Sequence, residues 1–143
     1  MCFAVYIGTD KELELGTFVP EQTDIYFEKL SDEEETALRL KFSKTNIYYV
    51  GSDTSCSCGL VFESEDFDDP DEQTNKKSPQ RFIDFLKEAT KAENIEYYCC
   101  WEGDWYLPTE HERELDIRDI SLDKNYFVGT QKEFINFKKQ IDE

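Results

Sequence analysis

An apolar run at residues 95–101, Ile-Glu-Tyr-Tyr-Cys-Cys-Trp, constrains the fold of this chain more than any other segment. Such a run is typical of a central strand that is buried on both faces of a sheet. The segment before it starts at Ser78-Pro79 and repeats apolar side chains at helical spacing, at Phe82, Phe85, Leu86 and Ala89. The chain is therefore expected to combine a buried sheet with an amphipathic helix.

Shorter patterns predict the remaining elements. Runs with β-type alternation or composition occupy residues 2–8, 24–30, 47–51, 59–63, 115–117 and 126–128. Capping boxes at Ser31 and Thr130, each with an acid three residues later, predict helices over residues 32–42 and 131–141. Strands and helices do not alternate regularly, so the fold class is α+β. At 143 residues, we expect a single domain over 1–143 with a mostly antiparallel sheet and about three helices.

The charge of the chain limits its partners. It carries 33 acidic and 16 basic side chains, a formal net charge of −17, which excludes nucleic acid and favours a basic protein partner. Acids concentrate in residues 63–77, which are expected to form an exposed, mobile connection. No long apolar run and no signal-peptide pattern is present, so we expect no membrane association and a cytoplasmic location.

The cysteines form three short clusters at the edges of predicted strands: Cys2, then Cys56 and Cys58, then Cys99 and Cys100. Side chains alternate along a strand, so Cys56 and Cys58 share a face and only one member of the third cluster can join them. A tetrahedral zinc site would therefore use Cys56, Cys58, either Cys99 or Cys100, and either Cys2 or His111. The predicted metal ligands are Cys2, Cys56, Cys58 and Cys99. The single residue between Cys56 and Cys58 is tighter than the usual spacing of zinc ligands.

Other interpretations of these cysteines stay open. The Cys-x-Cys pair could close a strained disulfide suited to thiol exchange, although Asp53 would raise the thiol pKa and no basic residue lies in the loop. Cys2 could act as an N-terminal nucleophile if Met1 is removed. Burial in the core, the commonest role of free cysteine, suits Cys2, Cys99 and Cys100.

A further candidate region is the end of the central strand, Trp-Glu-Gly-Asp-Trp at residues 101–105. Strand ends meet loops, and aromatic and acidic side chains there suit a ligand pocket. The predicted ligand-binding residues are Ser52, Cys56, Cys58, Trp101, Glu102 and Asp104. The single histidine, His111, lies among charged residues and is expected to be exposed.

The chain combines an N-terminal Met-Cys ahead of a strand, a Gly-Ser segment leading to Cys-Ser-Cys-Gly, and a Cys-Trp-Glu-Gly-Asp strand end. In this combination it resembles a small family of uncharacterised bacterial proteins. The resemblance implies that the three clusters form one site and carries no catalytic residue across. The leading hypothesis is a soluble bacterial protein with a cysteine-lined ligand or metal site. Alternatives are an acidic interaction module of the inhibitor or immunity type, and a thiol-dependent enzyme.

Overall fold

The computed structural model describes residues 2–141, which build one six-stranded sheet in the order β2-β3-β1-β4-β6-β5. Neighbouring strands are antiparallel, except that β5 runs parallel to β6. The strands are Phe3–Thr9 (β1), Ile25–Lys29 (β2), Asn46–Ser52 (β3), Ile95–Trp101 (β4), His111–Leu115 (β5) and Glu133–Phe137 (β6). Two α-helices occur in this part of the chain, Asp32–Leu38 (α1) and Lys77–Ala89 (α2). The expected α+β class with a mostly antiparallel sheet is thus confirmed.

The run at residues 95–101 is the central strand that its composition predicts. β4 lies between β1 and β6, and its residues are buried up to Cys100. Tyr97 and Cys99 point to one face of the sheet, whereas Tyr98 and Cys100 point to the other. The sheet therefore needs apolar cover on both sides.

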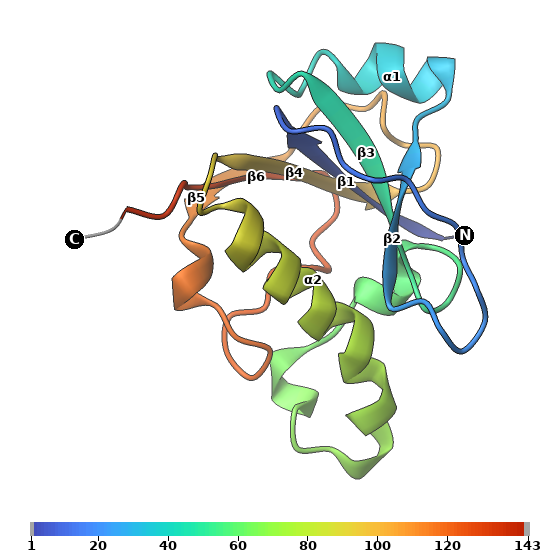
Figure 1. Cartoon of the computed structure of the whole chain (residues 1–143), viewed down its shortest axis with the longest axis vertical. Coiled ribbons are helices and arrows are strands. Elements are labelled where there is room, and N and C mark those ends of the chain that lie inside the picture. Colours follow the sequence, from blue (N-terminus) through green and yellow to red (C-terminus); the bar gives the residue numbers. More distant parts are fainter. Residues whose placement is uncertain (1, 142–143) are drawn as a thin grey trace.

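The two helices provide that cover on opposite faces of the sheet (Figure 1). α2 packs the larger core through Phe82, Ile83 and Leu86, each fully buried. α1 begins with the predicted capping box at Ser31 and closes the smaller core with Leu38 and the following Phe42. α2 starts at Lys77, one residue before the predicted start at Ser78-Pro79, and the Ser78 hydroxyl donates to the carbonyl of Asp24.

The prediction of a third helix over residues 131–141 is wrong, because residues 133–137 of this segment form strand β6. Its side chains alternate between the two faces, and Ile135 and Phe137 are fully buried in the larger core. Lys132 has a φ of 57°, a left-handed conformation that interrupts a right-handed helix, and its N–H donates to the carbonyl of Cys99. Pairing with β4 and β5 thus overrides a local capping pattern.

Three predicted strands are also absent from the described residues. Residues 59–63 do not return as a hairpin strand, because the chain after β3 turns into a short 3₁₀ helix, Ser57–Leu60. Residues 126–128 form a loop that buries Phe127 and Val128. The run at 115–117 is split between the end of β5 and a 3₁₀ turn, Ile117–Asp119.

The acidic segment 63–77 is mostly exposed and contains two 3₁₀ helices, Ser64–Asp66 and Pro70–Lys76. Within residues 2–141, no helix is long and apolar enough to cross a membrane.

Candidate functional site

Three of the five cysteines meet at one edge of the molecule. The sulfur atoms of Cys2, Cys56 and Cys58 all lie within 4.8 Å of one another, and each side chain is half-buried. Cys2 comes directly before β1, while the other two lie in the turn after β3. Figure 1 shows this turn, in green, beside the N-terminal end of β1. The fold thus brings together cysteines that lie more than fifty positions apart in the sequence.

The cysteine turn, residues 53–60, is attached to β1 by two hydrogen bonds. The N–H of Phe3 donates to Sγ of Cys58 at 3.3 Å, and the N–H of Val5 donates to Oγ of Ser57 at 2.9 Å. The Ser57 hydroxyl in turn donates to the carbonyl of Val50 on β3. Ser57 is completely buried, so its hydroxyl bridges two neighbouring strands at the point where they diverge. This bridge sets the position of the sulfur atoms on either side of it.

A second set of hydrogen bonds fixes the turn itself around Ser52. Its hydroxyl donates to the carbonyl of Cys56 at 2.6 Å and accepts from the N–H of Gly59 at 3.0 Å. The hydroxyl of Tyr26 donates to the carbonyl of Ser55, and the hydroxyl of Tyr49 accepts from the N–H of Ser57. Ser52 was predicted as a ligand-binding residue, and in this structure its buried hydroxyl holds the turn.

Gly59 is required for this close packing. A Cβ atom at Gly59 would lie 2.3 Å from Oγ of Ser52 and 2.6 Å from a carboxylate oxygen of Asp53. Both distances are too short, so any larger residue at this position would push the cysteine turn away from Ser52.

The pKa values of Cys56 and Cys58 are shifted in opposite directions. Partial burial opposes ionisation of Cys56, but hydrogen bonds from the hydroxyl of Thr54, the N–H of Cys58 and the other two thiols together lower its pKa below the ordinary value. Burial raises the pKa of Cys58 to about 11, and the neighbouring charge of Cys56 adds to that rise. The sequence offers no basic residue in the loop to lower a thiol pKa, and in the folded turn hydrogen bonds lower that of Cys56 instead. The hydrogen bonds of the folded turn therefore favour ionisation of Cys56 over that of Cys58.

The end of β4 touches this site through Glu102 and Trp101. The N–H of Glu102 donates to the carbonyl of Cys2 at 2.8 Å, and the half-exposed Trp101 ring packs edge-on against Phe3 with ring centroids 5.7 Å apart. Burial raises the pKa of Tyr49, and the charges of Cys56 and Glu102 add to the rise. The charge of Asp104 acts on the other face of the sheet, where it adds to burial and the charge of Cys99 in raising the pKa of Cys100.

The third cysteine cluster does not join the three sulfur atoms. The Cys99 thiol is fully buried and donates to the carbonyl of Thr130 at 2.8 Å, and Cys100 packs in the core on the other face. Burial raises the pKa of Cys99 to about 11 and that of Cys100 to about 12. His111 is exposed at the start of the edge strand β5. The described residues therefore supply three of the four predicted zinc ligands.

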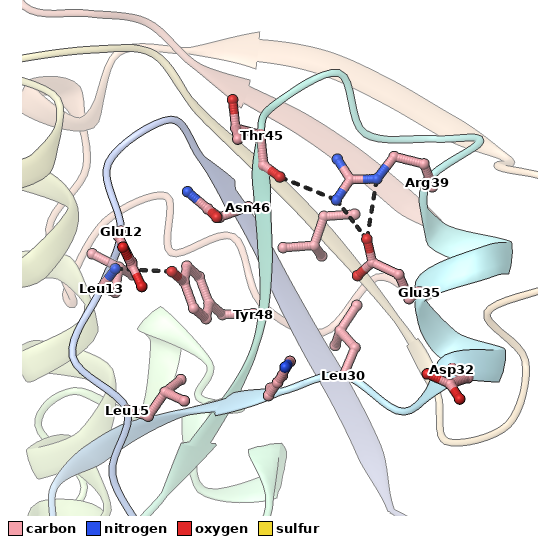
Figure 2. A pocket seen from close by; sticks show the side chains of 12 residues that line it. Glu12, Leu13, Leu15, Leu30, Asp32, Glu35, Arg39, Thr45, Asn46 and Tyr48 are labelled. Carbon is pink, nitrogen blue, oxygen red and sulfur yellow. Dashed lines mark hydrogen bonds and ion pairs between the residues drawn. The ribbon is translucent and has the colours of Figure 1, made fainter.

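A separate cavity of about 350 Å³ lies between α1, β3 and the loop after β1. Figure 2 shows two sets of polar contacts in it: Arg39 pairs with Glu35 and the carbonyl of Thr45, and the hydroxyl of Tyr48 accepts from the N–H of Leu13. No sulfur atom lines this cavity.

Sequence reasoning missed the residues that shape the cluster, namely Tyr26, Tyr49, Thr54 and Ser57. Only Ser57 carried a signal, because it stands between the two cysteines of the turn. No protein-family model, curated protein or solved structure matches this chain. The function is therefore argued from the site alone.

Proposed function

We propose that the protein binds a thiophilic metal ion, zinc in the first instance, through Cys2, Cys56 and Cys58. The observation that carries this proposal is the approach of the three sulfur atoms to within 4.8 Å of one another. A zinc–sulfur bond of about 2.3 Å places two sulfurs of a tetrahedral site roughly 3.8 Å apart. Small side-chain rotations about a turn already fixed by Ser52 and Ser57 would close the remaining gap.

The charge of the molecule supports a cation rather than an anion at this site. The chain has a formal net charge of −17, and the charge of Glu102 reaches Tyr49, whose hydroxyl accepts from the N–H of Ser57 in the turn. Soft thiolates select zinc or monovalent copper over magnesium or calcium. Three protein ligands leave the fourth position of a tetrahedral ion for water or a small ligand, an arrangement typical of zinc sites that exchange ligands.

A redox dithiol is the second candidate, and the unequal thiols favour it. The Cys56 thiolate could attack a disulfide substrate and release one thiolate, and Cys58 would then displace the second thiolate to form a Cys56–Cys58 disulfide. However, a ring closed across a single intervening residue is strained. Turnover of a small disulfide substrate that forms a Cys56–Cys58 disulfide, and that Cys58→Ser abolishes, would favour this second function over metal binding.

The metal proposal predicts saturable binding of one ion per chain. Reduced, metal-free protein is titrated with Co(II), and sulfur-to-cobalt charge-transfer absorption is expected to grow to one equivalent and disappear when Zn(II) displaces cobalt. Elemental analysis of untagged protein purified without chelators provides the independent measurement. Occupancy below about a tenth of an equivalent, with no charge-transfer band, would contradict the proposal.

Zinc affinity is expected to rise with pH. The pKa of Cys58 is about 11, so this thiol is protonated near neutral pH and must release its proton to become a ligand. The apparent association constant should therefore increase about tenfold per pH unit for Cys58 alone between about pH 6 and pH 8. Competition against a chelator of known affinity, at several pH values, measures this slope. A pH-independent constant would show that Cys58 is not a ligand.

A further inference from the structure

A surface groove of about 550 Å³ lies on the α1 face of the protein, away from the cysteine cluster. Its floor and walls are formed by Ala37, Leu40, Trp105 and Tyr106. Figure 1 shows the loop that follows β4 running beside α1. Lys41 joins these walls, because its Nζ donates to the carbonyl of Leu107 at 2.6 Å.

The groove exposes side chains that normally avoid water. Leu40 is 90% exposed and Tyr106 is 67% exposed, while Trp105 and Tyr106 stack edge-on with ring centroids 6.1 Å apart. Trp and Tyr dominate the binding energy of protein interfaces, and an apolar patch with a polar rim is typical of such surfaces. The exposed Leu40 gives this patch a centre beside the aromatic pair.

The rim of the groove is acidic. Asp32 and Glu33 line it directly, and the segments 32–41 and 102–110 that form it contain seven acids and two basic residues. Both basic residues are engaged: Arg39 pairs with Glu35, and Lys41 donates to Leu107 and lies over the ring of Tyr98. The groove therefore presents apolar surface beside the carboxylates of Asp32 and Glu33, whereas Glu35 and Glu110 pair with Arg39 and Lys132.

We infer that this groove binds a segment of a partner protein in which an apolar side chain is flanked by Lys or Arg. The apolar side chain would cover Leu40 and the aromatic pair, and the basic side chains would face Asp32 and Glu33. A second copy of this chain is disfavoured, because it would bring two acidic rims together in molecules of charge −17. A neutral small molecule is also disfavoured, because it would make no ion pair with Asp32 or Glu33 at the rim.

The test selects random-sequence displayed peptides on the full-length protein and measures the affinity of the selected peptides for three variants. Leu40→Lys places a charge at the centre of the groove, and Glu33→Gln removes one rim charge. Leu15→Lys is the matched control, because Leu15 is a half-exposed leucine outside the groove. Both groove positions are solvent-accessible, so neither change is expected to unfold the protein.

Selected peptides are expected to be enriched in Lys or Arg beside an apolar residue. Leu40→Lys should weaken their binding at least about tenfold and Glu33→Gln about twofold to fivefold, with less effect at high salt, while Leu15→Lys leaves it unchanged. Three results would overturn the inference: no selected peptide, peptides without the basic residues, or equal binding to Leu40→Lys. Concentration-dependent dimerisation that Leu40→Lys abolishes would assign the groove to a second copy instead.

Discussion

Replacing Cys56 with serine is expected to lower the affinity for zinc and cobalt by at least about 100-fold. Structural zinc sites with four ligands bind with roughly 10–16 kcal/mol, so one thiolate accounts for about 3 kcal/mol or more. Serine preserves the shape of the turn, because the backbone carbonyl of Cys56 makes the hydrogen bonds to Ser52. Isothermal titration and the intensity of the cobalt charge-transfer band measure the loss, and circular dichroism reports whether the fold is retained.

Cys99→Ser is the matched control for this change. A serine hydroxyl can replace the thiol as donor to the carbonyl of Thr130, so the buried site keeps its hydrogen bond. Metal affinity should stay within about threefold of the unchanged protein if the ligand set is the three clustered cysteines. Loss of binding in folded Cys99→Ser, equal to that in Cys56→Ser, would restore the four-cysteine set and refute the three-ligand site.

The candidate site could be predicted in part because side-chain parity is a local property. Alternation along a strand separated Cys99 from Cys100, and the turn composition singled out Cys56 and Cys58. Their meeting with Cys2 depends on β1 pairing with β3, which no local pattern specifies. The lowered pKa of Cys56 could not be predicted either, since it depends on hydrogen bonds that exist only in the folded turn.

Local sequence patterns likewise predict some elements of the fold, whereas others depend on contacts between distant residues. The strand at 95–101 and the helix around Phe82 were predictable because their apolar patterns are strong and match their burial. The segment at 133–137 was mistaken for a helix because Phe134, Ile135 and Phe137 fit either period. Pairing with β4 and β5 makes this segment a strand, and that pairing involves residues far away in the sequence.

Phe82→Ala is expected to have the largest effect on stability, lowering the free energy of unfolding by about 3–5 kcal/mol. The Phe82 ring is fully buried between α2 and the sheet, with the rings of Tyr97 and Phe127 at 6.4 and 5.9 Å between centroids. Its removal leaves a cavity that neighbouring aromatic rings cannot fill without leaving their rotamers. Urea denaturation followed by fluorescence measures the loss against a total of roughly 5–15 kcal/mol.

Phe67→Ala is the control of equal chemistry at a half-buried position in the acidic segment. The Phe67 ring lies under Nζ of Lys76 at 3.6 Å and packs only against the rim of the core, so we expect a loss of about 1–2 kcal/mol. Equal losses of unfolding free energy in both variants would show that α2 does not form the main core.

The folded fraction of Phe82→Ala should still bind zinc with unchanged affinity, because the cysteine turn is held by Ser52 and Ser57. Binding lost together with core packing would instead show that the three sulfur atoms meet only while α2 is fixed on the sheet, where the Ser78 hydroxyl accepts from the N–H of Asp53.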